Sequence, residues 1–440
     1  MTAMGPVERI AAAEAGLANP PARGPAWARR RKRAFDTIAS RGLPGRGDEN
    51  WKYLDHSRIA EYPFDVSPTA TVDAAALAPR MLPLEHAHRV VLADGRYEPR
   101  CSGRDVPAGL EIIDLGVLLE RDPQSALAML RAPGEDADDR FALLADALAT
   151  GGVLIRVAPG MEIAEPLYLV HLATAAAPAV HQSRVVIEAG SGARFTLVEH
   201  FVALGGAAAL GNLAAELTLG ESSVVTHLRL HEHSPAAAQI ETWVARLAGG
   251  SRYEQHLLVL GGRLVRSNLR LALEGRDAAC RLDGLFLADG DRQVDLHTAI
   301  THVGPATETT QDYRGIAAGR GRGAFNGKIV VQPTARGANA IQSSRNLLLT
   351  PLAEINARPQ LEILVDEVQC RHGATTGTLD PEQLFYLVSR GLDPETARAL
   401  LTFAFCREVT RRLPLAPVRA AAEMLLAGAL PDRELMRELG

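Results

Sequence analysis

The sequence has few cysteines, few aromatic residues and no long apolar run. Of its 440 residues, 4 are cysteines and 5% are aromatic. The cysteines lie far apart and form no CxxC pair, which excludes a disulfide framework and suits a reducing cytosol. No apolar run is long enough to span a bilayer, and residues 1–35 contain no apolar segment followed by a cleavage site. We therefore expect a cytoplasmic protein without a membrane anchor.

The sequence also lacks a surplus of positive charge. It has 47 Lys and Arg residues against 52 Asp and Glu residues, a formal net charge of -5. A nucleic-acid-binding protein would show a basic patch, so this balance argues against that class. The one strongly basic run, "ARRRKR" at residues 28–33, is interpreted as the solvated face of an N-terminal helix.

Common catalytic motifs are missing as well. There is no GxxxxGK[ST] loop, so we expect no nucleotide of the chain's own, and no GxSxG in a strand–turn–helix context. The glycine-rich "AAGRGRGAFNG" at residues 317–327 is followed by no helix that could hold a phosphate. We interpret it as a loop leading into the strand "KIVVQ", and we expect that the protein is not an enzyme.

What the sequence does contain is a long β-rich region between two helical ones. Over residues 151–378, short β-rich runs are separated by Gly, Asp and Asn, roughly every 15–30 residues, and no helical pattern interrupts them. This excludes βαβ folds. A sandwich or barrel is an alternative, but the similarity of the units favours a solenoid. We predict a mainly β fold with a right-handed parallel β-helix core at 151–378, an N-terminal helical and mixed domain at 1–150, and a C-terminal helical domain at 379–440.

The C-terminal region carries clear helix signals. Asp380 and Asp393 are each followed by proline, as N-cap residues often are, and Gly391 is placed to end the first helix. In the second helix the apolar spacing predicts one buried stripe. Its members are Ala397, Leu400, Leu401, Ala404, Phe405 and Val409.

Histidines are the first candidates for chemistry. In "THLRLHEH", His227, His231 and His233 alternate along one strand and so share a face. Imidazole suits Zn, Fe or Cu, but no carboxylate stands nearby at ligand spacing, so we interpret the three as an exposed polar face of the solenoid. His297 and His302 differ by five positions and are expected to face opposite ways.

A carbohydrate-active β-helix enzyme is a rival interpretation. Such an enzyme needs carboxylates clustered on one face, and usually an export signal. Four aspartates come close together here, but we interpret them as turn residues. They are Asp283, Asp289, Asp291 and Asp295.

The segment "QCRHGATTG", residues 369–377, is the second candidate. We predict a strand from Leu361 to about Cys370, with Cys370 and His372 on one face and a sharp turn at Gly373. A thiolate and an imidazole suit iron–sulfur or zinc chemistry, but two ligands alone hold no metal firmly. Either another chain supplies the remaining ligands, or Cys370 is simply a packed thiol.

Several motifs now occur in a recognisable order. "FNGKI", "QSSRNLLL", "LEI", "CRHGATTG" and "LFYLVSRG" lie within residues 325–392, and "GLPGRGDENWKY" lies at 42–53. The chain resembles the SufB/SufD family of iron–sulfur cluster assembly proteins over nearly its whole length. SufB-like members have an essential cysteine where this chain has Arg345, a glutamate where it has Gly373, and often an N-terminal cysteine cluster that is missing here. The resemblance is therefore to the SufD branch.

The resemblance implies a function and a set of partners. SufD-like chains have a β-helix core flanked by helices and serve as a subunit of the SufBCD scaffold. They pair with a SufB-like paralogue through the β-helix and with the ATPase SufC through the C-terminal helices. A nascent iron–sulfur cluster, or iron, is expected at the interface with SufB. Iron entry through this chain and flavin binding are left open.

The resemblance also assigns site residues. The family's functional histidine falls on His372, so His372 is the expected metal ligand, and Cys370 is its neighbour with the weaker claim. Arg371 adds a cation beside them, which disfavours a bound cation. The alternative function is a self-associating homodimeric scaffold that acts without SufB.

Overall fold

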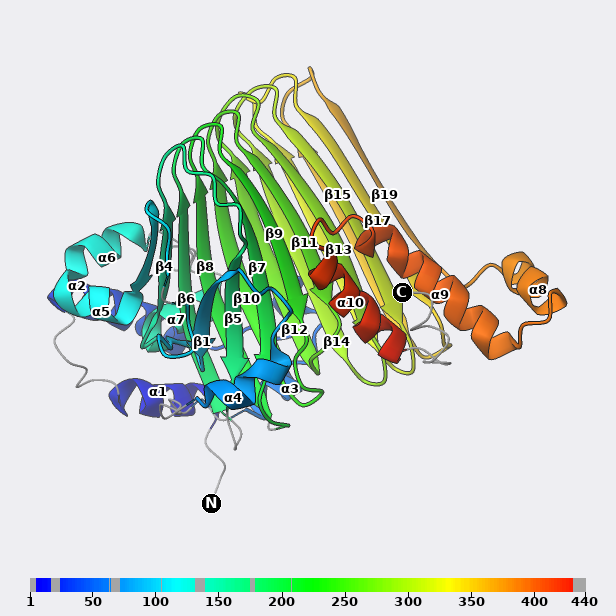
Figure 1. Ribbon diagram of the computed structural model, residues 1–440, viewed down its shortest axis with the longest axis horizontal. Helices are drawn as coiled ribbons and strands as arrows, with labels where there is room; N and C mark the ends of the chain where they lie inside the picture. The colour runs from blue at the N-terminus through cyan, green and yellow to red at the C-terminus, as the bar shows by residue number, and fades with distance from the viewer. Residues whose placement is uncertain are drawn as a thin grey trace.

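The structure is a computed structural model that describes residues 5–16, 24–62, 64, 72–103, 105–130, 139–174, 179–206 and 208–429. Its core is a parallel β-solenoid in which two sheets lie face to face, and successive coils stack from β4 to β19 (Figure 1). In the described part of residues 151–378 no helix interrupts the strands. The predicted mainly β fold with a β-helix core and helices at both ends is confirmed.

The two sheets take alternate strands of the chain. Sheet A contains, in spatial order, β18 (Glu354–Ile363), β16 (Arg322–Val331), β14 (Gln293–His302), β12 (Leu264–Leu273), β10 (Ala238–Leu247), β8 (Ala209–Leu219), β6 (Ala179–Ala189), β4 (Gly152–Val157) and β3 (Leu110–Asp114). Sheet B contains β19 (Gln369–Gly377), β17 (Asn339–Leu348), β15 (Glu308–Ala317), β13 (Ala279–Ala288), β11 (Arg252–Val259), β9 (Val224–His231), β7 (Arg194–Ala203), β5 (Leu167–Ala173), β1 (His88–Ala93) and β2 (Arg96–Tyr97).

The coils are similar in length but not identical. Ala238 pairs with Leu264 and Arg322 pairs with Glu354, offsets of 26 and 32 residues. Because side chains alternate along a strand, every second residue points between the sheets and the others point outward. The inward positions form one apolar core along the solenoid. The outward positions of both sheets need covers of their own.

Glycine at the turns lets one coil lie directly on the next. A β-carbon on Gly275 would lie 2.1 Å from the backbone nitrogen of Gly249, and one on Gly304 would lie 2.4 Å from the carbonyl carbon of Gly275. No side chain fits between backbones at that distance. The glycines that recur between the β-rich runs of the sequence are therefore explained by the close stacking of the turns.

The glycine-rich segment 317–327 is mostly strand, so its interpretation as a loop is wrong. Only residues 318–321 form the turn, and β16 begins at Arg322. A β-carbon on Gly323 would lie 2.5 Å from the ring of Phe286, and one on Gly327 would lie 1.8 Å from the side-chain nitrogen of Gln342. These glycines make room inside the solenoid for larger neighbours.

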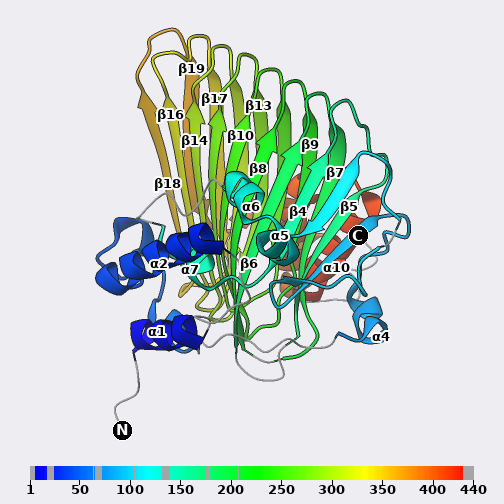
Figure 2. The ribbon, with the colours of Figure 1, turned by 90° about the vertical axis from the view of Figure 1, so that its left-hand side faces the viewer.

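Most N-terminal helices cover the outer face of sheet A, opposite the C-terminal ones, whereas the short helix Ala74–Leu77 packs on the outer face of sheet B (Figure 2). Phe141 and Leu144 of the helix Arg140–Leu148 pack there with Trp51 and with Ile240 of β10. The N-terminal elements are α1 (Pro6–Gly16), α2 (Gly24–Arg41), η1 (Glu49–Trp51), α3 (Ser57–Ala60), α4 (Ala74–Leu77), η2 (Ala78–Arg80), α5 (Leu115–Arg121), α6 (Pro123–Met129) and α7 (Arg140–Leu148).

The basic run at residues 28–33 is only half solvated, which corrects its interpretation as a solvated face. Arg30 Nε lies 2.9 Å from a carboxylate oxygen of Asp146, and the buried Arg31 donates from Nε to the carbonyl of Ala147 at 2.8 Å. Two of its guanidinium groups therefore join α2 to α7.

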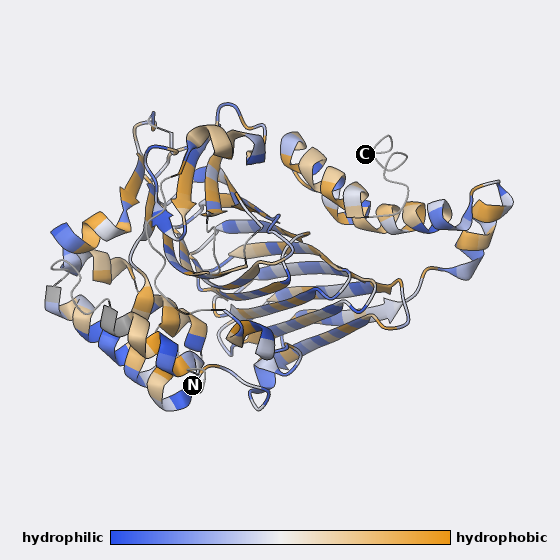
Figure 3. Ribbon diagram, turned by 90° about the horizontal axis from the view of Figure 1, so that it is seen from below, coloured by the Kyte–Doolittle hydropathy of each residue, from blue (hydrophilic) through white to orange (hydrophobic). Residues whose placement is uncertain are grey.

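The C-terminal helices are α8 (Pro381–Ser389), α9 (Pro394–Thr410) and α10 (Ala416–Ala429). α9 and α10 lie on the outer face of sheet B, whereas α8 projects from the body (Figures 1 and 3). Asp380 and Asp393 accept backbone hydrogen bonds as N-caps, and Gly391 has a φ of +97°, as the sequence predicted.

The apolar stripe predicted for α9 is only partly right. Ala397 and Val409 are buried as expected, but Ala404 is exposed. The face on the sheet includes Ala399 and Cys406. Phe403 is buried on the same face, so the face that contacts the sheet mixes small and large side chains.

Candidate functional site

The candidate segment lies at the open end of the solenoid. β19 pairs with β17 and β18 pairs with β16, and in the described residues neither strand has a neighbour on its outer side. The predicted strand Leu361–Cys370 is wrong, because the chain crosses from sheet A to sheet B at residues 364–368. Gly373 lies within β19 and makes no turn. The segment is therefore an edge strand with free backbone groups.

Cys370 and His372 do share a face, as predicted. They pair in register with Ala340 and Gln342, which point between the two sheets. Cys370 is half-buried against the core, and burial raises the pKa of its thiol, which keeps the thiol protonated at neutral pH. His372 is exposed although Gln342, one coil earlier, is 2% exposed. The difference arises because no further coil covers His372.

The surroundings of this end are apolar and cationic. Leu352, Ile363 and Leu364 are 68%, 42% and 49% exposed. Arg371 and Arg345 are exposed as well, at positions that alternate with the inward-facing ones. Large exposed apolar side chains beside two free strand edges are the features of a surface that another chain covers.

The exposed face predicted for His227, His231 and His233 is wrong. All three point between the sheets and are buried. Burial lowers the pKa of His227 to about 4 and that of His233 to about 3, so both are neutral at pH 7. The pattern of alternation was correct, but the sequence did not say which face of the strand is the inner one.

These histidines belong to a buried polar network. Arg229 of β9 donates to Glu199 at 2.5 Å and to Glu241 at 2.7 Å, and so joins sheet B to sheet A. His171 Nε2 lies 2.8 Å from Glu199. The rings of His171 and His231 both stack against the ring of Phe201, at centroid distances of 4.3 and 4.1 Å.

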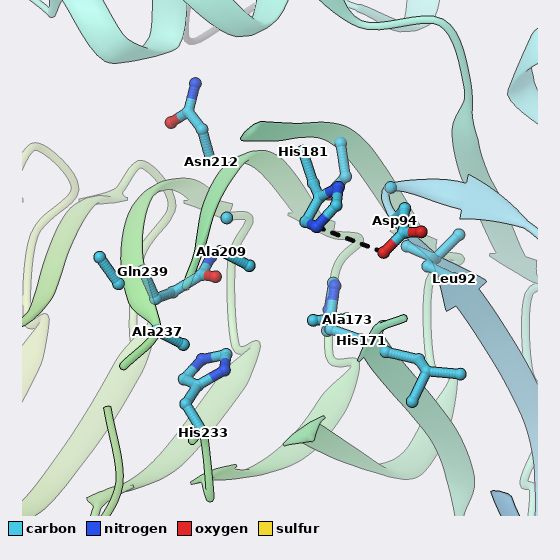
Figure 4. Close-up of a pocket in the computed structure, with 15 residues that line it drawn as sticks. Leu92, Asp94, His171, Ala173, His181, Ala209, Asn212, His233, Ala237 and Gln239 are labelled. Carbon is cyan, nitrogen blue, oxygen red and sulfur yellow. Dashed lines mark ion pairs between the residues drawn. The ribbon is translucent and has the colours of Figure 1, made fainter. Parts of the chain in front are cut away.

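One end of the network opens into a small cavity of about 40 Å³. Figure 4 shows Asp94, His171, His181 and His233 around it, with His181 Nε2 3.3 Å from a carboxylate oxygen of Asp94. His171 and His181 gave no signal in the sequence, because they lie in separate strands without a motif. The cavity is large enough for water.

The remaining histidines and aspartates are divided between two environments. His297 and His302 face opposite ways, as predicted: His302 is fully buried, and His297 is bonded to Asp295 at 2.8 Å on the outer face. Asp295 and Asp283 are buried strand residues, so their interpretation as turn residues is wrong. Asp289 and Asp291 do lie at a turn. The spacing of aspartates along the sequence does not distinguish one that lies in a strand and pairs with an arginine from one that lies in a turn.

A second exposed surface is formed by α8. Phe385 and Tyr386 are 75% and 56% exposed, and no residue of this helix is buried. Arg390 lies over the Tyr386 ring at 5.2 Å. An amphipathic helix that presents aromatic side chains to solvent is typical of a docking element.

Comparison with known proteins decides the family. The family model for the SUF system FeS cluster assembly SufBD core domain matches residues 171–405. The chain belongs to the SufBD family. It is 31% identical to the iron–sulfur cluster assembly protein SufD of Escherichia coli, over 84% of this chain and 86% of that protein.

Two further relatives agree with this assignment. An iron–sulfur cluster assembly SufBD family protein of Synechocystis is 29% identical over 89% of this chain and 88% of its own length. SufD of Bacillus subtilis is 27% identical over 64% of this chain and 65% of its own length. This chain is thus a SufBD-family protein of iron–sulfur cluster assembly that resembles SufD.

No helix in the described residues is long and apolar enough to cross a membrane. All four cysteines are free thiols, and Cys101, Cys280 and Cys406 are buried. Burial raises the pKa of the Cys280 and Cys406 thiols to about 12, which makes them inert packing residues.

Proposed function

We propose that this chain is a non-catalytic subunit of a cytoplasmic SufBCD-type scaffold. It pairs with a SufB-like chain at the open end of the solenoid and with a SufC-like ATPase through its C-terminal helices. The observation that carries the proposal is that β18 and β19 end the stack with free edges and exposed Ile363 and Leu364. A partner solenoid would continue both sheets and cover these side chains.

His372 would then lie at the joint between the two chains. Its inward register and exposure leave an imidazole nitrogen available to a ligand that the partner also contacts. We propose that His372 contributes to holding nascent iron–sulfur cluster or iron, with thiolates from the SufB-like chain as the other ligands. Cys370 is the weaker candidate, since it is half-buried with a raised pKa.

The C-terminal helices supply the contact with the ATPase. Phe385 and Tyr386 project from α8, while α9 and α10 are fixed to sheet B. Rearrangement driven by the ATPase would thereby be transmitted to the solenoid.

The test is anaerobic affinity purification of the tagged chain from its own host, with identification of every retained protein. Recovery of a SufB-like chain and a SufC-like ATPase is expected. Recovery of the chain alone as a homodimer would contradict the proposal and support the self-associating scaffold, because the same free edges can pair with a second copy.

A further inference from the structure

An apolar pocket of about 670 Å³ lies where the C-terminal helices meet the turns of the solenoid. Its walls come from residues 348–351, from Leu287 near the end of β13, from Leu379 before α8 and from Ala399 of α9. Ala429, the last residue of α10, also lines it. A pocket of this size and lining is within the range of protein binding sites.

The walls of the pocket are apolar but incompletely covered. Leu349 and Leu379 pack against the cluster that contains Leu287 and Ala399, yet both stay only half-buried. Leu384 of α8, which also lines the pocket, is half-buried as well. Apolar side chains seated between these leucines would complete their burial, which is favourable in water.

Two charged side chains line the pocket, and one of them has no partner. Asp289 is paired with Arg292 at 3.0 Å. Arg398 of α9 is exposed, and its guanidinium group forms no ion pair or hydrogen bond with any residue that the structure describes. The pocket therefore suits an occupant that combines apolar side chains with a carboxylate.

The chain itself supplies such a segment next to the pocket. Residues 430–440, "LPDRELMRELG", follow Ala429 and lie outside the described residues. This segment contains four large apolar residues and three acidic ones. They are Leu430, Leu435, Met436 and Leu439, and Asp432, Glu434 and Glu438.

Length and attachment favour this segment over a separate molecule. Its residues 430–440 can extend to about 40 Å, so its apolar side chains can reach every wall of the pocket. Because Ala429 joins the segment to the pocket, the segment is present there at an effective concentration of about 1 mM. A second copy or a free ligand has to compete with that concentration.

We propose that residues 430–440 bind in this pocket of the same chain. Side chains among Leu435, Met436 and Leu439 contact Leu349 and Leu379, and a carboxylate of the segment pairs with Arg398. The segment thereby joins α9 and α10 to the linker before α8 and to the turns of the solenoid. This contact is separate from the open end and depends on neither partner of the proposed function.

The test is photo-crosslinking of the purified full chain at high dilution, with Met436 replaced by benzoylphenylalanine and the crosslinked peptides identified by mass spectrometry. We expect crosslinks within one chain, from position 436 to residues 348–351 or 378–384. Leu435→Asp combined with Leu439→Asp should lower their yield about tenfold or more, since a charge is costly in an apolar pocket.

The matched control is Arg433→Gln combined with Arg437→Gln, which changes two polar positions of the same segment and should keep the wild-type yield. Arg398→Glu, at an exposed position, should lower the yield as the aspartate variant does. Thermal unfolding of each variant confirms that the solenoid is folded.

Three results would overturn the proposal. The first is the absence of crosslinks to the pocket, which would leave it to a partner. The second is crosslinks between chains, detected by mixing isotopically labelled and unlabelled protein, which would assign the pocket to a second copy. The third is an unchanged yield in Leu435→Asp combined with Leu439→Asp.

Discussion

His372 and Gln342 occupy equivalent inward positions on neighbouring strands, but only Gln342 is covered. The fold therefore exposes an imidazole where the strands of sheet B from β5 to β17 have a buried side chain. A residue in this position contributes little to packing and is available to a second chain. This is why a role at an interface suits it better than a role in the core.

The first prediction concerns His372. His372→Ala should leave the free energy of unfolding unchanged, since the side chain is exposed. Cluster assembly on the reconstituted complex should slow by about tenfold or more, as when a metal ligand or its support is lost. The measurement is the rate of cluster formation under anaerobic conditions.

His86, which is exposed and distant from the open end, provides the control. His86→Ala should assemble clusters at the wild-type rate. An unaltered rate in His372→Ala would remove the role proposed for this residue.

The buried histidines make stability depend on pH. Burial lowers the pKa of His227 to about 4 and of His233 to about 3, whereas an unfolded histidine titrates near pH 6.5. Below pH 6.5 the unfolded chain binds protons that the folded chain does not. The free energy of unfolding therefore falls as the pH drops from about 6.5 toward 4.

The second prediction follows from this linkage. Between pH 7 and 5.5, urea unfolding should show a loss of about 1 kcal/mol for each such histidine. His233→Gln should lose about that much less over the same range than the wild type, and His86→Gln should match the wild type. Equal pH dependence in His233→Gln and the wild type would contradict a buried, neutral His233.

At the scale of elements, one arginine fixes the C-terminal helices to the solenoid. Arg412, just after α9, bridges Asp283 of β13 and Asp312 of β15 at 3.0 and 2.9 Å. Arg314 of β15 donates in return to the carbonyl of Phe405 in α9 at 3.0 Å. The contact between helices and sheet thus combines these polar bonds with an apolar cluster.

The third prediction tests this anchor. Arg412→Ala leaves two largely buried aspartates without their shared cation and should destabilise the docking of α9 and α10 by about 1–3 kcal/mol. Hydrogen exchange should rise in these helices while the solenoid strands stay protected. The adjacent Arg411→Ala is the control, because Arg411 is 62% exposed and its ion pair is with Glu408, three residues earlier in the same helical segment. Equal exchange in the two variants would show that the anchor is not at Arg412.

The fourth prediction concerns α8. Phe385→Ala together with Tyr386→Ala should keep the fold, since both side chains are exposed, and should weaken binding of the SufC-like ATPase about a hundredfold if these are central aromatic anchors. Met424→Ala, 62% exposed on α10, is the control. Binding of the ATPase at wild-type affinity by the α8 variant would move the docking surface elsewhere.

At the scale of the whole molecule, the sequence predicted the solenoid well, but it did not predict which side chains of each strand point inward and which point outward. Period and turn residues sufficed for the core, since each coil repeats the same requirement for glycine at the turn, as at Gly275. They could not tell inward from outward on strands buried on both sides. His227 was therefore assigned to the wrong face, and Asp283 was taken for a turn residue.

The sequence predicted that Cys370 and His372 share a face, but it did not predict the strand boundaries around them. Alternation alone placed Cys370 and His372 on one face. The break at residues 364–368 was missed although Val365 and Val368 stand three positions apart, which interrupts the alternation of a strand. The buried network of Arg229, Glu199 and Glu241 was not found at all, since its members come from three strands that only the packing of the solenoid brings together.

The central claim is that the open end of the solenoid binds a SufB-like chain independently of the ATPase. The direct measurement is the composition of the complex co-expressed with both partners, by affinity purification and light scattering, for Ile363→Lys combined with Leu364→Lys. Both side chains are exposed, so the fold should survive. We predict that this variant loses the SufB-like chain and retains the ATPase, the reverse of the α8 variant. Retention of the SufB-like chain at wild-type stoichiometry would contradict the account.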